Sequence, residues 1–402
     1  MNSPAMPAPM RFEAGEKRAH WSGVFAMTLC VFALIASEFM PVSLLTPMAA
    51  DLRVSEGLTG YGIAISGAFA VLTSLSISRL AGAMNRKSLL LALTALMAVS
   101  GAVVALAPNY PVYMVGRALI GVVIGGFWSM SAATAMRLVP VDQVPRALAI
   151  FNGGNALATV VAAPLGSYLG AVIGWRGAFL CLLPVAALAL GWQWISLPSM
   201  SAERVAPHVN VFALFKRRVV VLGMAACGVF FMGQFALFTY VRPFLETVAH
   251  VDAPALALVL LGIGVAGFVG TVAIGAFLKR GLYRSLIAIP ILMAVVALAL
   301  VFFGARLWPV ATLLALWGLF ATAAPVGWWS WLAQTFTHDD AEAGGGLMVA
   351  VVQCSIALGS TVGGLLFDSR GYQSTFVASA VMLLMAALLA YLTAGRRLKG
   401  GP

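Results

Sequence analysis

The chain has 402 residues and a formal net charge of +11, and 62% of its residues are hydrophobic while only 9% are charged. Soluble globular domains have an apolar fraction nearer one half, so this composition excludes an ordinary soluble protein. Apolar stretches of about 20 residues recur from Ser22 to Ala394, and each is long enough to cross a ~30 Å hydrocarbon core. We therefore expect an all-α membrane protein.

Twelve membrane-spanning helices are predicted in chain order. They cover 22–46, 57–80, 88–107, 112–136, 146–173, 177–197, 219–242, 254–278, 285–304, 308–333, 343–367 and 373–395. The longest polar gap follows the sixth helix. It divides the chain into an N-terminal six-helix bundle (1–197), a cytoplasmic linker (198–218) and a C-terminal six-helix bundle (219–402).

The two halves resemble each other in sequence. At a fixed offset, four residues of the first half match four residues of the second: Gly166, Gly174, Trp175 and Phe179 match Gly363, Gly371, Tyr372 and Phe376. Both stretches end one span, turn on a glycine followed by an aromatic residue, and begin the next span. Parallel repeats of this kind form pseudo-symmetric bundles around a site near the middle of the membrane in secondary transporters.

The positive charges are placed according to membrane topology. Eighteen of the 24 Lys and Arg residues lie in the N- and C-terminal segments and in alternate gaps. The other set of gaps holds only Arg53, Arg176, Arg242, Arg306 and Arg370. This asymmetry predicts that both termini are cytoplasmic. It also explains the basic charge without nucleic-acid binding, and we expect no nucleic-acid partner.

Glu38 is the only acidic residue deep inside a predicted span. It lies about sixteen residues into the first span, or ~24 Å along it, in the outer half of the membrane. A charged carboxylate is unfavourable there, so Glu38 is a candidate for binding a proton on one side and releasing it on the other. The alternative is a permanently paired acid that stabilises the bundle.

Arg117 is the predicted partner of Glu38. It lies about two turns below the outer end of the fourth span, in the same half of the chain and at a similar depth. If the two side chains approach, a proton on Glu38 would release Arg117, and loss of the proton would recapture it, which would bias two conformations. A static ion pair or an arginine that reaches to the membrane surface is the alternative.

Polar and aromatic residues inside the spans are the candidates for substrate contact. They are Phe127, Trp128, Asn152, Asn155, Gln234, Phe238, Tyr240, Trp328 and Gln353. Amides beside aromatic rings suit a flat, uncharged solute that stacks and forms hydrogen bonds. Each aromatic residue alone has a packing or interfacial role as its alternative. Pro164 predicts a bend in the fifth span.

Several short motifs resemble those of drug:proton antiporters of the major facilitator superfamily. Arg117–Gly121 resembles the fourth-span motif whose arginine is implicated in proton coupling. Residues 163–166 (Ala-Pro-Leu-Gly) resemble the antiporter motif of the fifth span, and residues 174–176 (Gly-Trp-Arg) resemble the turn after it. The loop 78–87 is a degenerate form of the family's gating motif, with Gly82 where Asp is expected. The resemblance covers essentially the whole chain and implies the twelve-helix fold of that superfamily.

Four longer strings, 38–48, 125–131, 233–240 and 325–328, are similar to those of bacterial purine ribonucleoside efflux pumps. This resemblance implies export of inosine, guanosine and related nucleosides across a bacterial inner membrane in exchange for protons. It implies protons as the coupling ion with no other cofactor, and we expect no metal site and a monomer in the bilayer.

Other functions remain open on the residues alone. Related antiporters export sugars or lipophilic drugs, and a broad aromatic cavity would permit that. A passive channel fits less well with two similar halves around a single buried acid. An integral-membrane enzyme is disfavoured, because the sequence holds no P-loop, metalloprotease, serine-hydrolase or Cys/His metal motif.

Overall fold

The computed structural model describes residues 19–81, 84–140, 143–200, 217–336 and 341–399. In these ranges the regular elements are helices and there is no strand. They are α1 (Trp21–Leu52), α2 (Glu56–Ala81), α3 (Arg86–Ala105), α4 (Tyr110–Arg137), α5 (Val144–Leu180), α6 (Leu182–Ser196), α8 (Arg218–Phe238), α9 (Val241–Thr247), α10 (Ala253–Arg280), α11 (Leu282–Phe303), α12 (Leu307–Thr335), α13 (Ala341–Arg370) and α14 (Tyr372–Lys399).

The described residues supply twelve segments of membrane-spanning length, the number that the sequence predicts. The described residues contain 11 segments long and apolar enough to cross a membrane, and one of them, Arg146–Ser196, has 51 residues. That segment supplies two crossings, because its helix breaks at Gly174, where φ is 76° and ψ is 163°. Gly371, the matching position in the second half, has φ 78°. Both turns therefore use a left-handed backbone that glycine adopts without strain.

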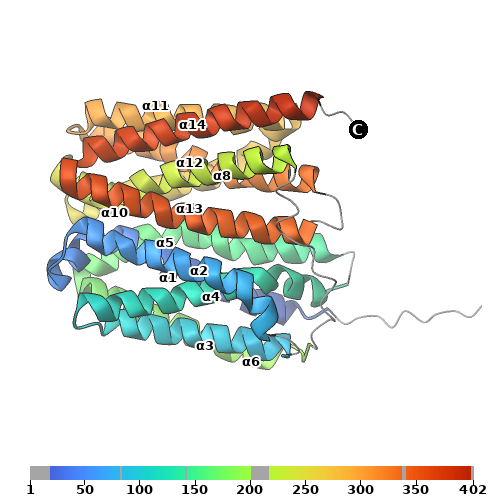
Figure 1. The fold of residues 1–402 in the computed structure, drawn as a ribbon. Coiled ribbons are helices and arrows are strands. Elements are labelled where there is room, and N and C mark those ends of the chain that lie inside the picture. The colour runs from blue at the N-terminus through green and yellow to red at the C-terminus, as the bar shows by residue number, and fades with distance from the viewer. Residues whose placement is uncertain (1–18, 82–83, 141–142, 201–216, 337–340, 400–402) are drawn as a thin grey trace, which may run out of the picture.

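The helices form two pseudo-symmetric six-helix bundles (Figure 1). In the first bundle α1 packs against α5 and α6, α2 against α4, and α3 against α4 and α6. The same five pairs recur in the second bundle, where α8 packs against α13 and α14, α10 against α12, and α11 against α12 and α14. The all-α fold with two related bundles is confirmed. The exact boundaries of the linker stay a prediction, because residues 201–216 lie outside the described ranges.

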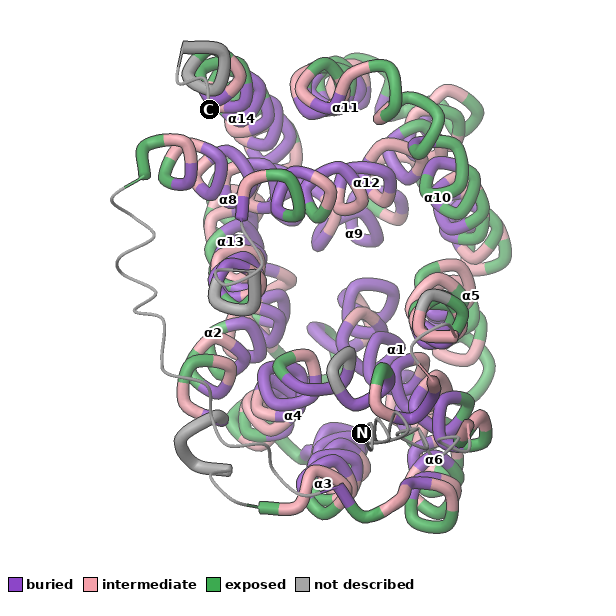
Figure 2. Tube along the Cα trace, turned by 90° about the vertical axis from the view of Figure 1, so that its right-hand side faces the viewer, coloured by how far each residue is buried: buried purple, intermediate pink, exposed green. Residues whose placement is uncertain are grey.

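Two seams join the bundles. Figure 2, viewed along the helices, shows α2 beside α13 on one side and α5 beside α10 on the other. Pro164 lies inside α5, and it leaves the carbonyl of Val160 without its usual helical partner. A Cβ on Gly264 of α10 would lie 2.8 Å from that carbonyl oxygen. The predicted bend residue thus lies in α5 one turn from a close contact between the bundles.

Many large apolar side chains lie on the outer surface of the bundles. Ile195, Phe302 and Trp308 are each about four-fifths exposed, as suits side chains that face lipid. The two ends of the bundles are named from α1. The proximal end is the one where α1 begins and α14 ends, at the right of Figure 1, and the distal end is the opposite one.

Gly125 of α4 permits close packing of α2 on α4, and a Cβ at this position would overlap the carbonyl oxygen of Ala70. We expect Gly125→Val to lower stability by about 1–3 kcal/mol, because the helices must separate. A lower thermal unfolding midpoint of the purified protein in detergent would show this. Gly262→Val is the matched control, because a Cβ on Gly262 has no atom within 4 Å. Equal midpoints for the two variants would contradict the packing argument.

Candidate functional site

Glu38 lies near the middle of α1 and is 3% exposed. Its carboxylate faces the second bundle, where the side-chain amide of Gln353 in α13 lies 3.5 Å from Oε1. Gln353 is itself 8% exposed. The buried acid and one of the predicted substrate amides therefore meet across the boundary between the bundles.

Arg117 of α4 is 1% exposed, and its guanidinium joins α4 to two other helices. Nη1 donates to the carbonyl of Ser37 (2.9 Å) and Nη2 donates to the carbonyl of Glu38 (3.1 Å), both in α1. Nε donates to the carbonyl of Gly62 (3.0 Å) and Nη2 also donates to the hydroxyl of Ser66 (3.2 Å), both in α2. Such a planar fork suits several acceptors at fixed positions.

Pro41 explains why the carbonyl of Ser37 is free to accept a side-chain donor. In a regular helix this carbonyl would accept from the backbone N–H of residue 41, four positions later. Proline has no N–H, so the carbonyl is left unpaired inside the membrane. The guanidinium of Arg117 takes the place of the missing donor, one residue before Glu38.

The expected approach of Arg117 to Glu38 is therefore observed, but its form differs from a direct ion pair. The guanidinium bonds to the backbone of Glu38, and the described contact of the carboxylate is with Gln353. Release and recapture of Arg117 by the carboxylate is thus not the arrangement seen here. The hydrogen bond between them in this conformation is made to the backbone of α1.

An aromatic pair adjoins the acid. The ring of Phe39, the residue after Glu38, stacks on Phe235 of α8 with centroids 5.7 Å apart and planes inclined by 26°. Phe238 meets Phe235 edge-on at 6.0 Å. Gln234, which precedes Phe235, is 9% exposed, and its Oε1 has no hydrogen-bond partner among the described residues. Sequence reasoning missed Phe39, although its position next to Glu38 was the available signal.

The remaining aromatic candidates lie in the bundle cores. Phe127 is fully buried and stacks on Phe151, and Trp128 meets both rings edge-on within the first bundle. Trp328 is 3% exposed and packs against Trp331 in the second bundle. These contacts correspond to the packing alternative for each residue, and the structure does not bring them to Glu38.

Three polar candidates have other surroundings. Asn152 is exposed, and its amide donates to the carbonyl of Leu148 one turn earlier (2.9 Å). Asn155 is half-buried, and its backbone carbonyl accepts from the hydroxyl of Thr159 (2.9 Å). Tyr240 is fully buried near the distal end, where its hydroxyl donates to the carbonyl of Ser360 (2.8 Å). The amide nitrogen of Asn152 and the hydroxyl of Tyr240 already have partners in this conformation.

Comparisons with known proteins agree with this architecture. The family model described as Major Facilitator Superfamily matches residues 27–344. The "Transcription regulatory protein OpdE" of Pseudomonas aeruginosa is 66% identical over 395 residues, which cover 97% of this chain and 98% of that protein. The "Purine ribonucleoside efflux pump NepI" of Salmonella enteritidis and of Salmonella typhimurium is 40% identical over 375 residues, which cover 93% of this chain and 94% of that protein.

Solved structures share the fold at low sequence identity. A bacterial homologue of the human lysosomal transporter Spinster has a TM-score of 0.78 at 16% identity, covering 96% of this chain and all of that one. The human organic anion transporter MFSD10 has a TM-score of 0.67, also at 16% identity, covering 92% of this chain and 99% of that one. The resemblance found in the sequence is confirmed: this chain belongs to the Major Facilitator Superfamily, as a membrane transporter and not an enzyme.

Proposed function

We propose that this transporter exports purine ribonucleosides, inosine and guanosine among them, in exchange for protons. In this proposal it spans a bacterial inner membrane with both termini in the cytoplasm and alternates between two conformations. The observation that carries the proposal is Glu38, a buried acid at the boundary between the bundles whose carboxylate meets the amide of Gln353. The relatives named as purine ribonucleoside efflux pumps support the substrate class.

Protonation of Glu38 is proposed to change a contact between the two bundles. As a carboxylate it accepts a hydrogen bond from Gln353 in the opposite bundle. A proton removes the charge and turns one carboxylate oxygen into a donor, which changes that contact. Arg117 fixes the backbone on which Glu38 is carried. A proton that binds the two conformations with different affinity shifts the balance between them.

The substrate base is proposed to bind at the pair Phe39 and Phe235. The two rings come from opposite bundles and are already stacked on each other. A purine base offers a flat face to such rings, and Gln234 offers an unpaired carbonyl oxygen that can accept from an N–H at the edge of the base. A buried acceptor without a partner is unfavourable, so a donor on the ligand would stabilise the complex.

The first experiment is uptake of radiolabelled inosine by inverted membrane vesicles that contain the protein. An acidic lumen reproduces the direction of export, and we expect accumulation only while that gradient is imposed. Collapse of the gradient by a protonophore should stop it. Inosine uptake that does not depend on the pH gradient would indicate a channel or facilitated diffusion. Movement of sugars or lipophilic cations without inosine would overturn the substrate assignment.

Phe39→Leu should weaken transport of purine nucleosides because it removes one stacking ring and keeps apolar volume. Loss of base stacking on an aromatic side chain costs about 1–3 kcal/mol, so the KM for inosine should rise about fivefold or more. Phe39→Tyr keeps the ring and should stay near the parent value. Phe268→Leu, on a half-exposed surface position of α10, is the matched control. An unchanged KM for Phe39→Leu would remove this residue from the site.

A second candidate function comes from the relative named as a transcription regulatory protein. A transporter alters transcription without touching DNA when it changes the cytoplasmic concentration of a solute that a regulator senses. This reading and the export proposal differ in one respect. Regulation through transport needs a working Glu38, whereas regulation by the protein as such does not.

A further inference from the structure

The arrangement at Pro41 occurs a second time in α1, nearer the distal end. Pro47 lacks the N–H that would satisfy the carbonyl of Ser43, four residues earlier. The donor that replaces it is Nη1 of Arg242, in α9. Arg117 belongs to the same bundle as α1, whereas Arg242 belongs to the other bundle. The second proline-freed carbonyl therefore forms a bond between the bundles.

Arg242 is held in place for this contact. It is 6% exposed, and Glu246, one turn later in α9, accepts from Nε at 2.8 Å and lies 2.8 Å from Nη2. The remaining nitrogen, Nη1, is the one that reaches Ser43. The ion pair offsets the charge of the guanidinium and fixes the direction of its third donor.

A second contact joins the bundles at the same end. Asp368, near the end of α13, accepts from the backbone N–H of Gly57 (3.0 Å) and from the hydroxyl of Ser55 at the start of α2. A carboxylate at a helix N-terminus is stabilised by the unpaired N–H groups and by the helix dipole. A Cβ on Gly57 would lie 2.8 Å from the carbonyl oxygen of Gly364, so the backbones approach closely here.

These contacts share one end of the molecule. The side-chain hydrogen bonds that join described residues of one bundle to described residues of the other lie at Glu38 or distal to it. The distal ends of the bundles are therefore fastened to each other in this conformation. A transporter that alternates access must undo such contacts when its distal side opens.

We infer that Arg242 is a further positioning residue of transport, which closes the distal side of the substrate path by bonding to the carbonyl that Pro47 leaves free. Glu246 aims the guanidinium, and Asp368 on the N-terminus of α2 fastens the neighbouring part of the same closure. The inference rests on membership of the transporter family and not on the identity of the substrate. With both termini cytoplasmic, the distal side is the one that faces out of the cell.

The test is a distance measurement between the bundles. Spin labels at Val115 and Phe302, two exposed positions in the distal parts of α4 and α11, are read by pulsed electron resonance in a background whose four cysteines are replaced. Arg242→Gln should raise the ratio of distal-open to distal-closed molecules about tenfold or more. Pro47→Ala returns an N–H to the helix, competes for the Ser43 carbonyl and should shift the ratio in the same direction by less.

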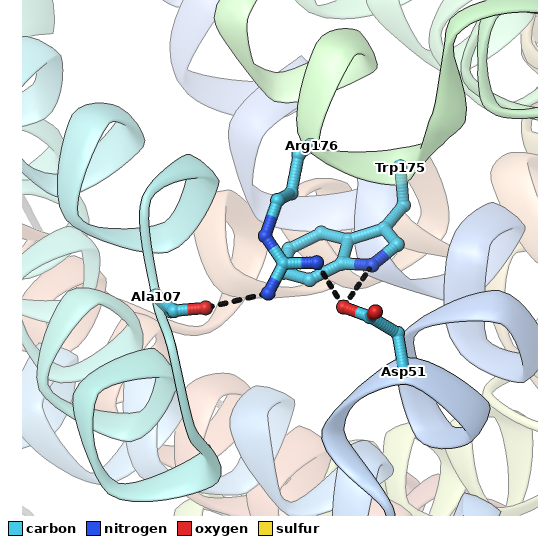
Figure 3. Close-up of polar contacts among 4 residues, drawn as sticks. All are labelled: Asp51, Ala107, Trp175 and Arg176. Carbon is cyan, nitrogen blue, oxygen red and sulfur yellow. Dashed lines mark hydrogen bonds and ion pairs between the residues drawn. The ribbon is translucent and has the colours of Figure 1, made fainter.

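Arg176→Gln is the matched control at the same end of the molecule. Arg176 bonds to Asp51 and to the carbonyl of Ala107 (2.7 Å), and Trp175 also donates to Asp51 (3.1 Å) (Figure 3). All four residues belong to the first bundle, so this variant should leave the distance unchanged.

Two outcomes would overturn the inference. One is a parental distance distribution in both Arg242→Gln and Pro47→Ala, each shown to be monodisperse. The other is an equally large shift in Arg176→Gln, which would indicate general loosening. Pro47→Ala leaves the Arg242–Glu246 pair intact. It therefore tests whether the bond from Arg242 to the Ser43 carbonyl closes the distal side, even if Arg242→Gln folds poorly. The distances require no substrate, and a failed inosine assay would leave this result standing.

Discussion

Glu38→Gln is expected to abolish accumulation of inosine driven by a proton gradient while leaving exchange of inosine across the membrane intact. The amide cannot take up or release a proton, so the proton gradient can no longer drive transport through this residue. It nearly preserves the size of the side chain, and it can still form a hydrogen bond with Gln353. Substrate binding and movement of the bundles therefore survive, and only the coupling is lost.

Two assays in the same inverted vesicles separate these effects. Uptake with an acidic lumen should fall to the level of vesicles without the protein, and counterflow of labelled inosine at equal pH should persist. The rate of counterflow should also no longer vary with pH. Glu56→Gln, at the first residue of α2, is the matched control and should keep gradient-driven uptake. Full gradient-driven uptake in Glu38→Gln would assign Glu38 a structural role.

The same variant discriminates the second candidate function. If the chain affects transcription by exporting a solute, cells with Glu38→Gln should show the transcript profile of cells that lack the protein. A parental transcript profile with uptake abolished would instead favour a regulatory role that does not depend on transport. Equal amounts of protein in the membrane are the necessary control for both readings.

The fold was accessible from the sequence because each span is a long apolar run and charge placement separates the two ends. The match of Gly174 with Gly371 also predicted a common turn, and both residues have φ above 70°. The break of the seventh span into α8 and α9 was missed. It falls at Thr239 and Tyr240, just before Pro243. Pro243 has no N–H for the carbonyl of Thr239, four residues earlier, so this proline was the available signal.

The site was only partly accessible from the sequence. Glu38 was predicted from its depth alone, because an acid in hydrocarbon is unfavourable wherever the helix faces. The aromatic candidates could not be sorted in this way, because these helices are apolar on every face and have no polar stripe to mark the interior. Phe127 and Trp328 consequently lie in the bundle cores, whereas Phe39, next to the acid, lies between the bundles.

The sequence also could not predict which groups accept hydrogen bonds from Arg117, since a guanidinium can bond to a carboxylate or to a carbonyl with similar geometry. Pro41 decides between them by leaving the carbonyl of Ser37 unpaired, and nothing in the spacing of Pro41 and Arg117 shows that their helices meet there. Once the contact is known, it predicts an energetic coupling between these two residues, which are far apart in the chain.

Arg117→Lys is expected to lower stability and transport, because an ammonium group cannot reach the carbonyls of Ser37 and Gly62 together. Hydrogen bonds between membrane helices contribute about 0.6–2 kcal/mol each, so a loss of about 1–3 kcal/mol follows. Pro41→Ala gives Ser37 a backbone donor of its own. The double variant should therefore lose less stability than the two single variants added together, by about 0.5 kcal/mol or more.

This coupling is measured from the free energies of unfolding, in detergent, of the parent, Arg117→Lys, Pro41→Ala and the double variant. Pro290→Ala is the matched control, because Pro290 is buried in α11 of the other bundle and shares no partner with Arg117. Its effect should simply add to that of Arg117→Lys. Additivity for Pro41→Ala as well would mean that Arg117 does not serve the carbonyl of Ser37. The bond from Arg117 to the carbonyl of Glu38 would then be the remaining backbone connection between Arg117 and the proton site.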